Sequence, residues 1–198
     1  MTETPDLPRG YDPARDIKLD ARSLRGLTHP LRVQMLGQLR LHGSATASQL
    51  AERLGQSSGA TSYHLRQLAA YGFIVEDPGR GTERERWWRA AHRSTYFDTV
   101  DEDNRAAGGE YLRAVARAYS ERLLRFADSV ETVAEDFGPD WDRGHTMSDW
   151  SYDLTAEQAA RLQADLEELA ERYRTEQPAP GTRKVVLQVQ LFPLGERR

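Results

Sequence analysis

The sequence predicts an α+β fold that is mainly α-helical, and three observations lead to this prediction. Apolar residues recur at helical spacing in several segments, including a long one at 105–137. Helix starts carry capping signals, such as Thr46 followed by Gln49. The glycine-containing turn "DPGRG" (77–81) separates two strand-like runs. We predict helices and a β-hairpin, then a long helix, then a strand-helix-strand region.

Composition excludes several classes of protein. The 198 residues have 38% hydrophobic content and a mean hydropathy of -0.73, and no apolar run approaches the ~18 residues of a membrane span. The start "MTETPDLPRG" does not resemble an export signal, so we expect a cytoplasmic protein without a membrane partner. There is no cysteine, the five histidines lack metal-ligand spacing, and no catalytic or phosphate-binding motif occurs. We therefore expect no metal, no cofactor, no catalytic residue and no enzyme activity.

Charge is distributed unevenly along the chain. The formal net charge is -4, which by itself argues weakly against a nucleic-acid partner. Residues 20–98 contain 11 Arg and Lys against 7 Asp and Glu, whereas residues 99–144 contain 6 against 11. The first part of the chain is therefore basic and the middle is acidic. The positions of the arginines, rather than their number, have to support any binding hypothesis.

The first hundred residues are typical of a winged helix. After a proline-bearing arm at 1–16, Asp20 is a plausible N-cap, and Pro30 opens a second helix that Gly43 ends. A short helix follows Thr46, and a turn at Gly55 leads to a further helix that starts at Ser57 or Ser58. Two helices joined so closely have helix-turn-helix geometry. With strands at 73–76 and 83–89, residues 17–97 form a predicted winged helix-turn-helix domain.

The second helix of this motif has two faces. Its apolar side contains Ala60, Thr61, His64, Leu65 and Leu68, and its other side contains Ser58, Gly59, Ser62, Tyr63 and Arg66. The second face is small and hydrogen-bonding, so it can approach base edges in a major groove, although an ordinary solvated face is the alternative. Adjacent helical residues diverge by about 100°, so Tyr63 and His64 do not share a reaction centre.

The hairpin adds further arginines. Arg80 lies at the predicted tip, and Arg84 and Arg86 share one face of the return strand. They suit contacts with DNA phosphates or the minor groove, although a charged edge strand that prevents aggregation is the alternative. Trp87 and Trp88 point to opposite faces, so at least one should anchor the hairpin on the helices. The predicted DNA-contacting set is Ser57, Ser58, Gly59, Ser62, Tyr63, Arg66, Arg80, Arg84 and Arg86.

Residues 98–198 are the predicted dimerisation region. The helix predicted at 105–137 has apolar residues in steps of three and four, which is typical of a seam that packs on a partner helix. The strands predicted at 146–154 and 184–192 flank a helix that follows Thr155, and they can pair within one chain or across a dimer. The predicted dimerisation seam consists of Leu112, Val115, Tyr119, Leu123, Phe126, Val130 and Val133, with Phe137 continuing the pattern.

Residues 17–95 resemble winged-helix transcription regulators of the ArsR family. The matching segments are "LRGLTHPLRVQML", "ASQLAERLG", "SSGATSYHLRQLAAYGFI" and "GRGTERERWWRA". The resemblance implies a homodimer that binds an inverted-repeat operator in double-stranded DNA and usually represses. By position it implies that Ser57 caps the recognition helix, that Ser58, Ser62 and Tyr63 contact bases or phosphates, and that Arg80 is the wing contact. Metal-sensing members carry cysteines where "TASQLA" has none, so metal sensing is not implied.

A second hypothesis concerns the aromatic residues of the C-terminal region. Trp141, Trp150 and Tyr152 could line a pocket for an unknown small-molecule effector, which would make the protein a ligand-gated sensor. The alternative is that they fill a dimer core, because buried aromatic residues usually serve packing.

Overall fold

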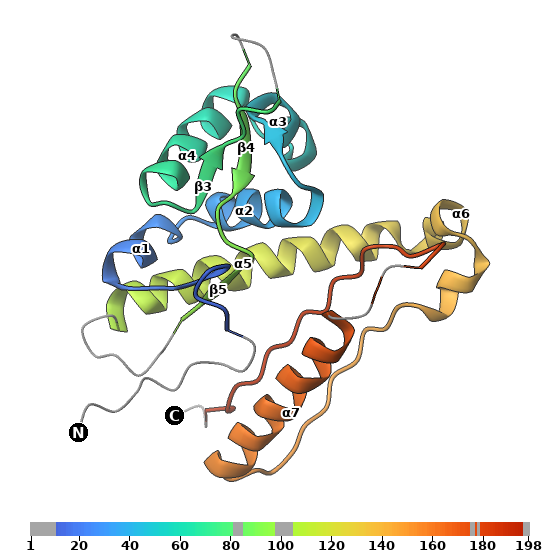
Figure 1. Cartoon of the computed structure of the whole chain (residues 1–198). Helices are drawn as coiled ribbons and strands as arrows, with labels where there is room; N and C mark the ends of the chain where they lie inside the picture. The colour runs from blue at the N-terminus through green and yellow to red at the C-terminus, as the bar shows by residue number, and fades with distance from the viewer. Residues whose placement is uncertain (1–10, 81–84, 98–104, 175–176, 178, 196–198) are drawn as a thin grey trace. The chain divides into compact units, whose positions relative to one another are not determined.

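The computed structural model describes residues 11–80, 85–97, 105–174, 177 and 179–195 (Figure 1). The chain divides into two compact units, of which one is Asp12–Ala127 and the other contains Asp128–Arg198. The predicted fold class is confirmed, since helices predominate and the described strands are short. The predicted domain limits 17–97 and 98–198 differ from these units, because the first unit also contains most of the long helix.

Four helices form the body of the first unit, and local side-chain caps define their starts. Asp20 and Ser23 form a capping box at the first helix, and Thr46 and Gln49 form another at the third. Pro30 is the first residue of the second helix, and Gly43 follows its last turn with a φ of 78°. These four predicted boundary signals are confirmed. The helices are α1 (Ala21–Gly26), α2 (Pro30–His42), α3 (Ala47–Leu54) and α4 (Ser58–Ala70).

Two small sheets complete this unit. β3 (Ile74–Glu76) and β4 (Trp87–Ala90) form the predicted antiparallel hairpin, which we call the wing together with the residues that connect them. The return strand predicted at 83–89 begins only at Trp87, so Arg86 precedes the strand and does not share a strand face, and residues 83 and 84 lie outside the described residues. β4 also pairs with β2 (Ala45–Thr46), which the sequence did not predict because two residues are too few to show a strand pattern. β1 (Asp16–Lys18) pairs in parallel with β5 (Ser94–Tyr96).

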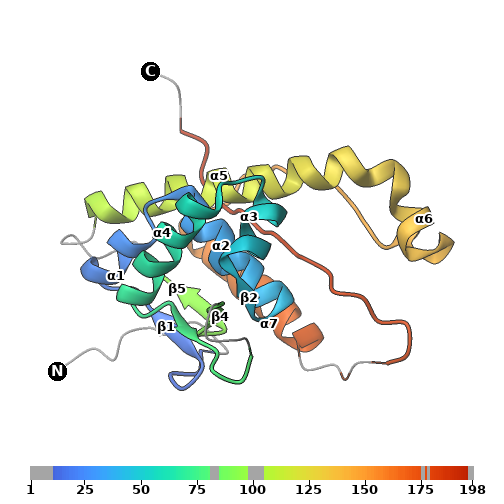
Figure 2. The same cartoon turned by 90° about the horizontal axis from the view of Figure 1, so that it is seen from above.

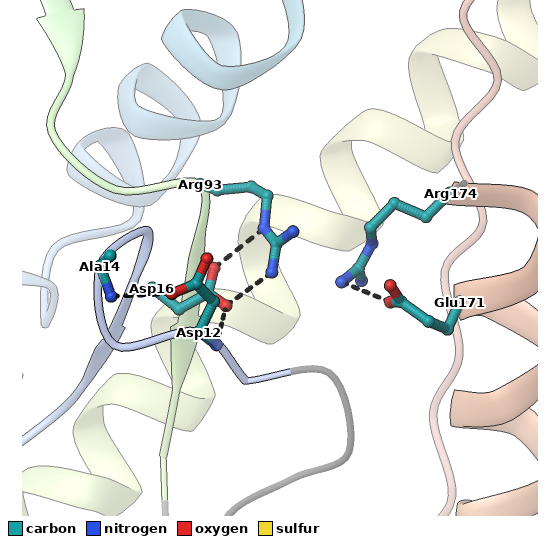
Figure 3. A network of polar contacts seen from close by, with 6 residues as sticks. All are labelled: Asp12, Ala14, Asp16, Arg93, Glu171 and Arg174. Carbon is teal, nitrogen blue, oxygen red and sulfur yellow. Dashed lines mark hydrogen bonds and ion pairs between the residues drawn. The ribbon is translucent and has the colours of Figure 1, made fainter. Parts of the chain in front are cut away.

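The end of the predicted arm belongs to this domain. Residues 1–10 lie outside the described part of the arm predicted at 1–16, whereas Asp16 is only 2% exposed. The guanidinium of Arg93 donates to both carboxylate oxygens of Asp16, at 3.1 and 2.7 Å. Asp12 and Ala14 form the tight turn that precedes this ion pair (Figure 3). The pair therefore fixes β1 beside β5.

The core lies between the helices and the wing. Leu24, Met35, Leu50, Leu65 and Phe73 are among its fully buried side chains. Trp88 is 7% exposed and packs into this core, whereas Trp87 is half-buried, as their opposite directions on the strand predicted. The wing is thus anchored on the helices through Trp88.

The long helix α5 (Arg105–Ser129) packs on the same domain through a stripe of small residues. Ala114 and Ala118 are both 2% exposed, and Tyr111 packs against the core, where burial raises its pKa to about 12. The Gln34 side chain on α2 donates a hydrogen bond to the carboxylate of Glu121. α5 passes next to α2 in both views of the molecule (Figures 1 and 2).

The helix predicted at 105–137 is not continuous. α5 ends at Ser129 and is followed by a 3-10 turn, η2 (Val130–Thr132), and by α6 (Val133–Phe137). The hydroxyl of Thr132 donates to the carbonyl oxygen of Ser129 at 3.0 Å, and such local side-chain bonds compete with α-helical hydrogen bonding. The β-branched residues of this segment also have low helix propensity.

The second unit is loosely packed. Besides α6 it contains η3 (Pro139–Arg143) and α7 (Ala156–Arg174), whose predicted capping box at Thr155 and Gln158 is confirmed by two hydrogen bonds. No residue of α7 is buried. The strands predicted at 146–154 and 184–192 are not formed among the described residues, where neither segment belongs to a sheet. Alternating apolar residues become a strand only when a neighbouring strand pairs with them.

Candidate nucleic-acid interface

The link between α3 and α4 sets the geometry of the candidate site. Gly55 adopts a left-handed conformation with a φ of 62°, which glycine tolerates without the strain that a Cβ would cause. The Ser57 hydroxyl oxygen then accepts a hydrogen bond from the Ala60 amide at 3.2 Å and caps α4. Three residues therefore join the two helices, in a helix-turn-helix arrangement.

The exposed face of α4 is the one that the sequence predicts. Thr61, His64, Leu65 and Leu68 are buried against the domain. The opposite face is open, with Tyr63 50% exposed. Ser57, Ser58, Gly59 and Arg66 are likewise exposed, and Ser62 is half-buried. This face is free to approach another molecule.

His64 has a structural role beside Tyr63. Its side chain is 9% exposed, and its ring centroid lies 4.3 Å from that of His29, whose side chain caps α2. Burial is the main cause that lowers the pKa of His64, and the nearby His29 and Arg32 act in the same direction. His64 is therefore neutral at neutral pH and packs within the domain, whereas Tyr63 faces solvent.

A hollow of about 530 Å³ lies between α4 and the wing, and we call it the reading groove. It brings together Ser62 and Arg66 of α4 with Arg86, which directly precedes β4. The sequence analysis did not select Ala47 and Ser48 of α3, which line the same groove because β2 holds the start of α3 beside β4. The lining residues are Thr46, Ala47, Ser48, Ser62, Leu65, Arg66, Glu85, Arg86 and Trp88.

The wing arginines have different local partners. The Arg80 guanidinium lies 5.9 Å from the centre of the Trp87 ring, a cation-π geometry that holds it on the outer side of the wing. Arg86 Nη1 lies 3.1 Å from Glu76 Oε1, in an exposed pair that contributes little stability. Arg84 lies outside the described residues. Within the described part of the chain, Arg66 and Arg80 take part in no ion pair, so both charges are available to an anion.

The predicted seam, which runs along α5 and beyond its end, is partly uncovered within one chain. Leu112, Leu123 and Val130 are 47%, 43% and 38% exposed. Val115, Tyr119 and Phe126 are half-buried, and Val133, beyond the helix break, is 8% exposed. The stripe that packs on the domain contains Ala114 and Ala118 and is rotated from the seam by about 100°, the turn of one residue along a helix. The seam therefore stays available to a partner.

A comparison with protein families agrees with this geometry. Residues 27–77, which contain α2, α3, α4 and β3, match the family model of a helix-turn-helix domain. A search of the curated proteins found no match to the chain. The match and the open face of α4 indicate a DNA-binding domain of the kind that transcription regulators carry. None of the helices in the described segments is long and apolar enough to cross a membrane.

Proposed function

We propose that this chain is a sequence-specific transcription regulator of the ArsR type, which binds an inverted-repeat operator as a homodimer and represses transcription. One observation carries the proposal: the reading groove places the outward face of α4 and the base of the wing around a single hollow. A recognition helix can contact base edges in the major groove of DNA while a wing contacts the neighbouring DNA backbone.

Each element of this surface has a separate task. The N-terminal end of α4, at Ser57 and Ser58, presents backbone N–H groups and a positive helix dipole to a phosphate. Tyr63 and Arg66 lie further along the same helix and reach base edges. Arg80 and Arg86 hold the backbone beside the wing, because guanidinium groups bind phosphate without regard to sequence.

A second copy of the chain is the proposed partner of the seam on α5. One such domain makes few phosphate contacts, and a symmetric pair on a palindrome raises the effective concentration of the second domain once the first is bound. The uncovered leucines of the seam are apolar and regularly spaced, as a helix-helix interface requires. The dimer is symmetric, so the same seam serves both copies.

Selection from random duplexes followed by fluorescence anisotropy tests the proposal. We expect selection to enrich one palindromic sequence. The Arg66→Ala variant should bind this sequence more weakly, with a loss of ~1–3 kcal/mol in binding free energy, because a base contact is lost. Arg80→Ala and Arg86→Ala should weaken binding to every duplex and reduce its salt dependence. Tyr63→Ala should change the preferred sequence. The matched control is Arg125→Ala, an exposed arginine of α5 that should bind as the parent does.

Two outcomes would contradict the proposal. Selection that enriches no sequence would contradict sequence-specific reading. Unchanged affinity in the Tyr63, Arg66, Arg80 and Arg86 variants would contradict the assignment of the surface.

The aromatic residues of the second unit remain a candidate effector site. Trp150 and Tyr152 are 73% and 64% exposed, so in one chain they are open to a ligand or to the second copy. Trp141 is half-buried, and its ring centroid lies 6.4 Å from that of Phe137. The measurement is tryptophan fluorescence during titration with a metabolite panel, and a saturable change would favour the ligand-gated form of the regulator over pure dimer packing. We propose no catalytic role for the chain.

A further inference from the structure

A second hollow of the first unit carries an excess of positive charge, and we call it the basic hollow. It has a volume of about 480 Å³ and lies where the end of α2 meets the end of β4. Its lining includes Arg15, Arg40, Arg89, His92 and Arg93, and it includes no carboxylate. Four arginines therefore line one hollow, from segments that are up to 78 residues apart in the sequence.

Among the described residues, one of these arginines forms an ion pair. Arg93 pairs with the buried carboxylate of Asp16 (Figure 3). The described residues provide no ion pair for Arg15, Arg40 or Arg89. Arg40 instead donates to two neutral acceptors, the carbonyl oxygen of His92 at 3.0 Å and the hydroxyl of Thr95 at 2.7 Å. The Asp16 carboxylate, which already pairs with Arg93, also acts on Arg40 through its charge. It is therefore shared between two arginines, and Arg15 and Arg89 form no ion pair with a described residue.

Arg40 and His92 are the partly enclosed members of this group. Both are half-buried, and Nδ1 of His92 has no hydrogen-bond partner among the described residues although solvent does not reach it. Burial, followed by the neighbouring Arg40, lowers the pKa of His92, while Asp16 acts in the opposite direction. A neutral imidazole beside several guanidinium groups can donate one further hydrogen bond to an anion. A cation without a paired charge and an unsatisfied buried nitrogen both call for a physical explanation.

We propose that the basic hollow binds a small anionic molecule that carries a carboxylate or a phosphate group. Guanidinium groups bind both groups through paired, charge-assisted hydrogen bonds. The volume of the hollow lies within the ~300–1,000 Å³ typical of small-molecule sites. An anion held there would contact Arg40 and Arg89 at once and would neutralise the charge that the domain leaves unbalanced.

The position of the basic hollow separates it from the reading groove. Arg80 lies in the turn after β3, and β4 runs from that side of the wing towards α2 (Figure 1). Arg89 and His92 lie at the far end of β4, and the two hollows share no lining residue. The two hollows are therefore separate sites, which favours a small molecule in the basic hollow over the duplex that the reading groove faces.

Isothermal titration calorimetry with the full chain tests this site. Inorganic phosphate and citrate are the two probes, each titrated in a low-salt buffer at constant chloride concentration. We expect saturable binding of at least one probe. The double variant Arg15→Ala/Arg89→Ala should weaken it about tenfold or more, because two charge-assisted contacts are lost. Both side chains are exposed, so the variant should keep the parent's circular dichroism spectrum. Tighter binding of phosphate would indicate a phosphate ester, and tighter binding of citrate an organic acid.

Two further variants make the result specific to the hollow. Arg40→Gln can keep a hydrogen bond to Thr95 but removes the charge, so it should also weaken binding of the probe. Arg66 lines the reading groove, so the Arg66→Ala variant should bind the probe with the same affinity as the parent. Absence of saturable heat with both probes would overturn the proposal, as would equal affinities of the parent and the double variant. Loss of duplex binding in the double variant, without probe binding by the parent, would instead assign the hollow to DNA phosphates.

Discussion

The exposed leucines of the seam on α5 allow an estimate of how much they contribute to the association free energy of the dimer. Leu112 and Leu123 keep 47% and 43% of their surface exposed in one chain. Full burial of a leucine side chain contributes about 2 kcal/mol, so covering the remaining half contributes about 1 kcal/mol per side chain. A symmetric dimer contains two copies of each leucine, so four side chains are covered. The variant Leu112→Ala/Leu123→Ala should therefore lose up to about 4 kcal/mol of association free energy, roughly 1,000-fold in Kd.

Sedimentation velocity over a dilution series measures this change. Leu124→Ala is the matched control, because Leu124 is 63% exposed and lies on a different side of the helix from the seam. Alanine keeps the helix propensity high, so both variants should retain the helical circular dichroism of the parent. The reasoning would be refuted by a parent chain that stays monomeric. It would equally be refuted by a double variant whose Kd changes no more than that of the control.

Three further predictions concern the stability of the first unit, measured by urea unfolding. Trp88→Ala should lower the free energy of unfolding by ~3–5 kcal/mol, because it empties a core position that is 7% exposed. Gly26→Ala should lower it by ~1–3 kcal/mol, because the new Cβ would lie 2.7 Å from the Phe73 ring. The pKa of His64 is lowered in the folded state, mainly by burial. Its contribution to the free energy of unfolding is therefore fully present above pH 6.5 and is lost as pH falls through the folded-state pKa. His64→Phe should make the free energy of unfolding depend less on pH in this range.

Local signals predicted the helices of the first unit well. The N-cap at Asp20, the capping box at Thr46 and the glycine after α3 depend on residues a few positions apart and are visible in the sequence. The division of α4 into a buried and an open face follows from helical periodicity in the same way. The break of the long helix at Ser129 was missed, because apolar spacing continues through a local change in backbone hydrogen bonding.

Other features depended on segments that are far apart in the sequence. The reading groove needed β2 and β4 to pair, which brings Ser48 beside Arg86. The basic hollow needed the parallel pairing of β1 and β5, which places Arg15 near Arg93. Neither pairing has a local signature, because strands of two or three residues are too short to show alternation.

The sequence by itself determined where α1 to α4 begin, which face of α4 is open, and that α5 carries a regular apolar seam. Hydrogen bonds and side-chain periodicity within a few residues decide these properties. Tertiary structure decided which stripe of α5 packs on its own domain. The sequence predicted the seam for a partner helix and did not single out Ala114 and Ala118, which lie against the domain and leave Leu112 and Leu123 partly exposed. Small side chains allow two elements to approach closely, and only the packed structure shows where that approach occurs.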